Sequence, residues 1–79
     1  MIDGQSLMLS PLDARVLRAT DPSRERTVVR VAELLGCSED VAASCLRRLR
    51  ERMLVEVDGS RPTGWLRTHR GDVVLEHQP

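Results

Sequence analysis

The sequence contains no lysine, phenylalanine or tyrosine, and its one aromatic side chain is Trp65. A single ring cannot form the stacking platform on which proteins hold single-stranded nucleic acid. The chain also lacks an apolar run long enough to cross a bilayer, and it does not open with a basic segment followed by an apolar one. We therefore expect a cytoplasmic protein, and we expect any nucleic acid that it binds to be double-stranded.

Cysteine and histidine are scarce. Cys37 and Cys45 lie eight residues apart, without a C-x-x-C pair and without histidines at zinc-ligand spacing. We interpret both as reduced, small core residues, the alternative being a redox-sensing thiol that would need an exposed setting and a low pKa. His69 and His77 share no metal partner, so the sequence predicts neither a metal nor a cofactor.

The chain has 79 residues, of which 41% are hydrophobic and 30% are charged. This composition predicts one folded domain over residues 1–79, without linkers or repeats. A chain of this size buries only about 60 to 65% of its unfolded surface, so an enclosed substrate pocket is hard to build. No catalytic Ser, His and Asp set has a motif behind it, and we do not expect an enzyme.

Charge is balanced overall but unevenly distributed. Twelve arginines face twelve acidic residues, so the formal net charge is zero and there is no global positive field. Between residues 44 and 71, however, seven arginines stand against three acidic residues, whereas the first 43 residues are net acidic. A surface that binds phosphate must therefore be local and must lie in the second half of the chain.

Apolar periodicity and capping residues predict four helices and a hairpin. Ser10 and Pro11 begin a helix that runs to Ala19. A short strand over Thr27–Val29 comes next. A second helix follows it at once, with the apolar residues Val31, Ala32, Leu34 and Leu35. Gly36 ends that helix, because glycine readily takes the left-handed conformation of a tight exit. Ser38 caps a third helix that reaches about Arg52, with Ala42, Cys45, Leu46 and Leu49 as its buried stripe.

The remaining elements are a hairpin and a last helix. Strands over 54–57 and 65–67 flank a turn-rich loop over 58–64, and Thr68 caps a helix over about 69–77. Trp65 is expected to wedge the hairpin against the helices, the alternative being an anchor in an interface.

The order of these elements and several of their residues resemble a winged helix-turn-helix. The similar stretches are Val31-Ala32-x-x-Leu35-Gly36-Cys37-Ser38 at the turn, Leu46-Arg47-Arg48-Leu49-Arg50-Glu51-Arg52-Met53-Leu54-Val55-Glu56 at the entry to the wing, and Trp65-Leu66-Arg67-Thr68-x-x-Gly71 at its exit. The layout over about residues 10–76 is similar to the core of bacterial transcription regulators of the MarR and PadR type. Two differences are Met53, where a glycine is usual, and the lack of the long flanking helices with which those families dimerise and hold effectors.

The resemblance implies that the third helix, about 38–52, lies in the major groove, with the wing, about 54–67, on the backbone or minor groove. The base-facing positions would then be Glu39, Asp40, Ala43, Ser44 and Arg47. The candidates for contact with the DNA backbone are Ser38, Arg48, Arg61, Arg67 and Arg70. Glu39 and Asp40 have an alternative role, which is to complement the dipole of the helix at its N-terminus.

Two functions therefore remain. The first is sequence-specific binding of double-stranded DNA, as a small transcription regulator or as an accessory factor of a phage or mobile element. If it forms a homodimer through its first or last helix, its half-sites should lie about 34 to 36 Å apart. The second is a winged-helix adaptor, subunit or inhibitor that binds a protein, such as a transcription complex, and does not read DNA.

Overall fold

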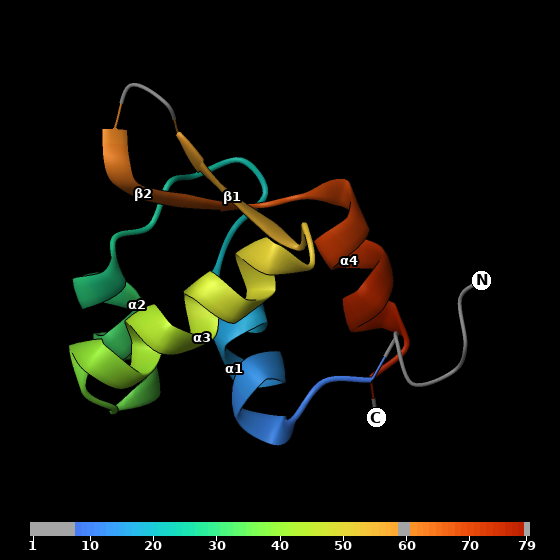
Figure 1. Ribbon diagram of the computed structural model, residues 1–79, viewed down its shortest axis with the longest axis horizontal. Helices are drawn as coiled ribbons and strands as arrows, with labels where there is room; N and C mark the ends of the chain where they lie inside the picture. Colours follow the sequence, from blue (N-terminus) through green and yellow to red (C-terminus); the bar gives the residue numbers. More distant parts are fainter. Residues whose placement is uncertain (1–7, 59–60, 79) are drawn as a thin grey trace.

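Three helices, a two-stranded hairpin and a fourth helix follow one another in the computed structural model, which describes residues 8–58 and 61–78 (Figure 1). The elements are α1 Pro11–Ala19, α2 Val28–Leu35, α3 Glu39–Glu51, β1 Val55–Asp58, β2 Arg61–Arg67 and α4 His69–Glu76. The hairpin projects from the group formed by α1, α2 and α3, and α4 lies at the far end from α2 (Figure 1). The expected class, mainly helical with a hairpin wing, is confirmed.

Each helix begins at a hydroxyl side chain that accepts a hydrogen bond from the backbone N–H three residues later. The capping residues are Ser10, Thr27, Ser38 and Thr68, with oxygen to nitrogen distances of 3.0 to 3.2 Å. Such a cap satisfies one of the free N–H groups of the first turn. Three of these four caps were predicted, and they fix the starts of α1, α3 and α4.

The fourth cap explains a wrong prediction. Thr27–Val29 is not a strand, because the Thr27 hydroxyl accepts from the Arg30 N–H and α2 begins at Val28. The extended pairing lies one residue earlier, where Arg26 and Trp65 exchange two backbone hydrogen bonds of 3.0 and 2.9 Å. The β-branched side chains at 28 and 29 thus enter a helix, whose hydroxyl cap outweighs their preference for a strand.

The turn between α2 and α3 depends on Gly36, as predicted. Gly36 has a φ of 67° in the left-handed region, and its N–H donates to the Glu33 carbonyl while that of Cys37 donates to the Ala32 carbonyl. Those two bonds close the end of the helix. A Cβ at Gly36 would meet no atom within 4 Å, so the backbone angle alone requires glycine there.

One apolar core joins all the helices and the hairpin. It contains Val16, Leu17, Val31, Ala32, Ala42, Cys45, Leu46, Leu49, Leu54, Val55, Trp65 and Val74. The predicted stripe of α3 and the wedging role of Trp65 are confirmed. Leu34 is the exception in α2, because 47% of it is exposed.

The hairpin is antiparallel and irregular. Val55 pairs with Arg67 and Val57 with Trp65, and the register shifts between Val57 and Asp58, which is the mark of a bulge. The second strand begins at Arg61, four residues earlier than the sequence pattern indicated, because the pattern of turn residues extends into the strand. No helix among the described residues is long and apolar enough to span a membrane.

Candidate nucleic-acid interface

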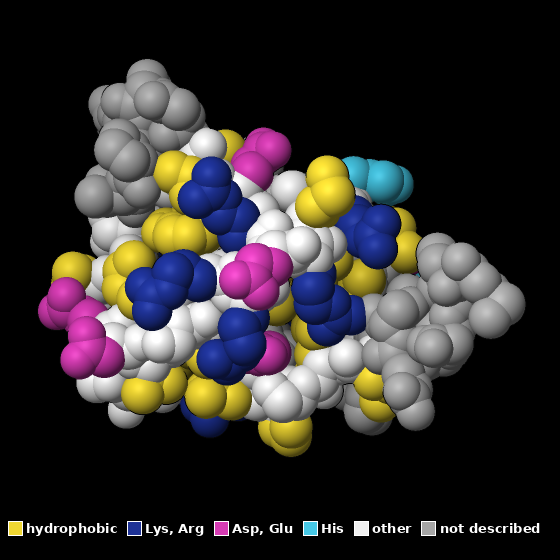
Figure 2. Space-filling model, viewed as in Figure 1, with side chains coloured by type: hydrophobic (Ala, Val, Ile, Leu, Met, Phe, Trp, Pro, Cys, Tyr) yellow, Lys and Arg dark blue, Asp and Glu magenta, His cyan; other side chains and the backbone are white. Residues whose placement is uncertain are grey.

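The outward side of α3 is set by the residues that it buries. Ala42, Cys45, Leu46 and Leu49 face the core. At 100° per residue, the opposite side of the helix carries Asp40, Ser44, Arg47 and Glu51. Figure 2 shows arginine and carboxylate side chains alternating over α3 on this face, with arginines gathered toward the C-terminal end of the helix. The outward side of α3 is therefore mixed in charge.

The five predicted base-facing residues all lie on α3, over its first nine residues. Glu39 and Asp40 are exposed in the first turn, where the helix dipole favours a negative charge. Ala43 and Ser44 are half-buried, and Arg47 is exposed. The guanidinium of Arg47 donates to the Ser44 hydroxyl at 3.3 Å, so the two form one polar unit.

Three exposed arginines have no carboxylate partner among the described residues. Arg47 and Arg50 line a shallow hollow together with Glu51. Arg50 and Arg70 line a second groove, of about 420 Å³, beside β1 and the start of α4. No ion pair joins any of the three to another described residue. Their charges are therefore free to meet an anionic ligand.

Arg48 is already paired. Its guanidinium donates to the Asp13 carboxylate at 2.8 Å and links α3 to α1, and 15% of the Asp13 side chain is exposed. Partial burial raises the pKa of Asp13, but hydrogen bonds and the charge of Arg48 outweigh it, so the pKa lies below its ordinary value. The pair holds α3 against α1, and this use of Arg48 competes with the predicted contact to DNA.

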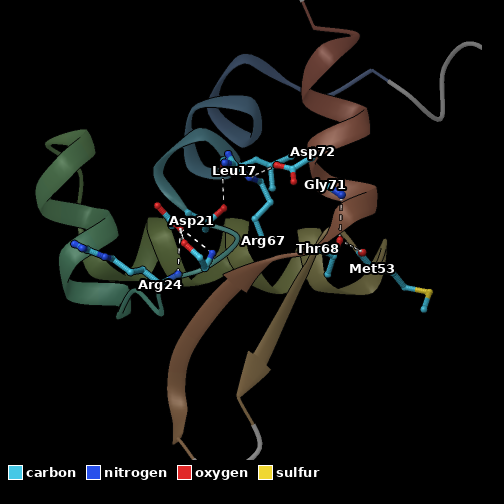
Figure 3. A network of polar contacts seen from close by, with 10 residues as sticks. Leu17, Asp21, Arg24, Met53, Arg67, Thr68, Gly71 and Asp72 are labelled. Atoms are coloured by element: carbon cyan, nitrogen blue, oxygen red, sulfur yellow. Dashed lines mark hydrogen bonds and ion pairs between the residues drawn. The ribbon is translucent and has the colours of Figure 1, made fainter.

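Arg67 is an internal support. Its Nε lies 2.7 Å from the Asp72 carboxylate, and its Nη1 donates to the Leu17 carbonyl at 3.2 Å (Figure 3). Only 16% of its side chain is exposed. The guanidinium thereby ties β2 to α1 and α4, and we leave it out of the candidate interface.

Ser38 and Arg61, which were also predicted to contact the DNA backbone, lie at opposite ends of the site. The Ser38 hydroxyl accepts from the Val41 N–H at 3.2 Å and keeps its own hydrogen for another acceptor. Arg61 begins β2, but its side chain lies outside the described residues.

Two residues of the site were missed from the sequence. Arg50 is one helical turn beyond Arg47, and Glu51 lies on the outward side of α3 and lines the same hollow as the two arginines. The spacing of three and four residues from Arg47 could have identified both. Arg50 forms no ion pair among the described residues.

Comparison with known proteins supports the fold. No protein-family model and no curated protein sequence matches the chain. Among solved structures, the chain is similar to BpsR of Bordetella bronchiseptica, whose structure concerns the regulation of its DNA binding by 6-hydroxynicotinic acid. The TM-score is 0.76 at 22% identity, over 92% of this chain and 54% of that chain. The chain thus spans about half of BpsR and shares its winged-helix fold.

Proposed function

We propose that this protein binds double-stranded DNA sequence-specifically and regulates transcription, or serves a phage or mobile element as an accessory factor. The observation that carries the proposal is that Arg47 and Arg50, exposed on α3, form no ion pair with any described residue. BpsR, which has the same fold, has a regulated DNA-binding activity. That likeness favours DNA over other polyanions.

The geometry suits the major groove of B-DNA, which is wide enough to admit one helix. Arg47 lies on the outward side of α3 and can donate to O6 and N7 of one guanine, with Ser44 beside it as a second base contact. Arg50 and Arg70 lie on the flank toward β1 and α4, where they can bind phosphates and fix the register. The hairpin, which carries Arg61, would follow the adjoining backbone or minor groove.

The carboxylates on the same face predict a specific kind of binding. Glu39, Asp40 and Glu51 would repel a phosphate backbone, so the affinity for an arbitrary sequence should be low. A carboxylate can also accept a hydrogen bond from N4 of cytosine, which rewards one base and penalises others. Zero net charge acts in the same direction, because little attraction extends beyond the contact surface.

The test is selection from random duplex DNA, followed by salt titration of the winning sequence against two double variants. Arg47→Gln with Arg50→Gln removes two charges from α3. Arg15→Gln with Arg26→Gln removes two charges from the other side of α1. We expect the first variant to lose about 1–3 kcal/mol of binding free energy and to lower the salt slope by about one to two, with the control close to the parent.

Failure of the proposal would be equally visible. If protein shown to be folded enriches no sequence and shows no salt-dependent binding of duplex DNA at low ionic strength, DNA binding is excluded. A palindromic winner would support a homodimer on DNA, with the half-sites one helical turn apart.

The second candidate function is binding of a protein partner, such as a transcription complex, through α3 itself. It is favoured by the exposed carboxylates of Glu39 and Asp40 at the start of the helix. The double change Glu39→Lys with Asp40→Ser separates the two. It should strengthen nonspecific DNA binding if α3 reads DNA, and it should abolish partner binding if α3 binds protein.

A further inference from the structure

A second basic surface lies away from α3, in a hollow of about 420 Å³ between α1 and α2. Its lining consists of Arg15, Arg18, Ala19, Arg26, Leu34 and Leu35. Arg15 is two residues from Asp13, which pairs with α3, and is therefore about 200° around α1 from that contact. The proposed DNA surface on α3 and this hollow consequently lie on different sides of α1.

The charge of the hollow is of one sign. Three of its six described lining residues are arginines and none is acidic. Arg15 donates to the Leu35 carbonyl at 3.4 Å, and the Nε of Arg26 is buried without an acceptor among the described residues. That Nε is out of reach of a ligand, so an incoming carboxylate would pair with the charge that the guanidinium group carries as a whole.

The Asp21 carboxylate, which feels the charge of Arg26, does not fill this role. It accepts hydrogen bonds from the N–H and hydroxyl of Ser23 and from the N–H of Arg24, at 2.8, 2.9 and 3.1 Å. The bonds from Ser23, aided by those from Arg24 and by the Arg26 charge, lower the pKa of Asp21. The hydrogen-bonding capacity of Asp21 is thus taken up within its own turn.

The floor of the hollow distinguishes a protein ligand from a nucleic acid. Leu34, which is 47% exposed, lies beside Leu35 and Ala19 among the arginines. A phosphate backbone gains nothing from covering leucine, whereas an apolar side chain flanked by carboxylates would fill the hollow and pair with its rim. The combination of apolar floor and cationic rim therefore fits an acidic peptide segment.

The site is held in place before a ligand arrives. Two backbone hydrogen bonds to Trp65, of 3.0 and 2.9 Å, fix Arg26, and 93% of the Trp65 surface is buried against the core. Arg15 and Arg18 occupy successive turns of a helix whose Val16 and Leu17 are fully buried. Binding would thus order few groups, which keeps the entropic cost of association low.

The same charges disfavour a second copy of this chain as the ligand. A two-fold axis passing across the exposed side of α1 would bring Arg15 and Arg18 against the same residues of the other copy. Like charges at close range oppose such a contact. The favoured occupant is a different protein that carries the opposite charge.

We propose that the hollow between α1 and α2 is a docking site for an acidic segment of a partner protein, in which an apolar side chain is flanked by carboxylates. The apolar side chain would cover Leu34, and the carboxylates would bind Arg15 and Arg26. This inference does not depend on DNA binding by α3. If both hold, the protein is a bridge that attaches an acidic partner to a DNA site.

The experiment is a display selection of random short peptides on the folded full chain, with binding of the enriched peptides measured by fluorescence anisotropy. We expect peptides in which acidic residues flank a leucine, isoleucine or phenylalanine. Arg15→Gln with Arg26→Gln should weaken their binding at least about tenfold, since two charge-assisted hydrogen bonds are lost. The matched variant Arg47→Gln with Arg50→Gln, which also removes two charges, should bind the peptides unchanged.

A second variant keeps the test valid if the double change impairs folding. Leu34→Ser alters only an exposed floor residue and should weaken the same peptides. The proposal is overturned if no acidic peptide is enriched, if binding survives both Arg15→Gln with Arg26→Gln and Leu34→Ser, or if it is lost instead in the α3 variant. It is also overturned if duplex DNA displaces the peptides from the α3 variant, because the hollow would then be a nucleic-acid site.

Discussion

Met53 has a backbone conformation that favours glycine, although it carries a side chain. Its φ of 62° lies in the left-handed region, and 69% of the residue is exposed, so the side chain contributes little packing. Its N–H donates to the Arg50 carbonyl at 2.9 Å and its own carbonyl accepts from the Thr68 hydroxyl at 2.7 Å. The turn from α3 into β1 thus requires the left-handed conformation, which costs a residue with a Cβ about 1–2 kcal/mol.

Met53→Gly is therefore expected to raise the free energy of unfolding by about 0.5–1 kcal/mol, after the greater freedom of glycine in the unfolded chain is subtracted. Met53→Ala, which removes the same side chain but keeps the Cβ, should bring no such gain. Urea unfolding followed by circular dichroism measures both. Equal stability of the two variants would show that the backbone angle is not strained.

For single residues, the sequence predicted backbone conformation and helix caps better than it predicted the partners of charged side chains. The departure from glycine at Met53 was visible in the pattern, and so were the capping hydroxyls of Ser10, Ser38 and Thr68. The engagement of Arg48 was not, because Asp13 lies 35 residues away and only folding brings the two together. Some arginines thus form structural ion pairs and others form none among the described residues. The difference depends on contacts between distant parts of the chain, which local spacing in the sequence does not reveal.

Among the elements, the junction of β2 and α4 depends on two residues of the Thr-x-x-Gly pattern. The Thr68 hydroxyl donates to the Met53 carbonyl and accepts from the Gly71 N–H, while the Thr68 N–H donates to the Leu54 carbonyl (Figure 3). A Cβ at Gly71 would collide with the Leu54 carbonyl oxygen, which belongs to the backbone. Glycine is needed there for close approach, since α4 packs directly on the entry to β1.

Gly71→Ala should accordingly lower the free energy of unfolding by about 2–3 kcal/mol, because a backbone atom has to move. Gly64→Ala provides the comparison, since its Cβ would meet the side chain of Glu25, which can turn aside. We expect the loss at Gly64 to be less than half of that at Gly71. Thermal unfolding of the two variants decides, and a larger loss at Gly64 would contradict this account of the junction.

The order of elements was predictable because a hydroxyl residue caps the start of each helix or a glycine follows its end. Boundaries failed where two signals compete, at Thr27–Val29 and at the start of β2. Val28 and Val29 suit a strand, but their neighbour Thr27 is also a helix cap, and the cap prevails. The exposure of Leu34 was likewise beyond the pattern, because helical periodicity does not tell how far a partner helix extends.

For the molecule as a whole, arginine-only basicity determines how it responds to acid. Lowering the pH protonates carboxylates but leaves all twelve arginines charged, so the balance at neutral pH becomes a large positive excess. The pair of Asp13 and Arg48 lies within this balance and connects the acidic first half to the basic second half. The Asp13 carboxylate has a lowered pKa and forms the ion pair between α1 and α3, so protonation of this group in acid should weaken that contact.

The pKa of Asp13 is lower in the folded protein than its ordinary value of 3.8. The stabilisation is therefore fully present above pH 3.8 and is lost as the pH falls through the lower, folded pKa. Asp13→Asn should be less stable than the parent near neutral pH, and the difference should shrink as the pH falls below 3.8. Glu33→Gln, which breaks an exposed pair with Arg30 at 3.8 Å, should change stability little at either pH.

Urea unfolding at neutral pH and in acid measures this comparison. A constant difference between Asp13→Asn and the parent at both pH values would mean that the carboxylate charge does not support the contact of α1 with α3.

The single tryptophan gives the molecule an intrinsic optical reporter. Trp65 is buried in the core, and its backbone is bonded to Arg26, whose side chain lines the α1–α2 hollow, while its strand leads to the junction with α4. All indole emission from this chain therefore comes from Trp65, which is bonded to a residue of the hollow. A shift of the Trp65 emission on binding of the peptide alone would mean that the two surfaces act independently. A shift on binding of duplex DNA as well would show, without any label, that occupation of α3 is sensed beside the hollow.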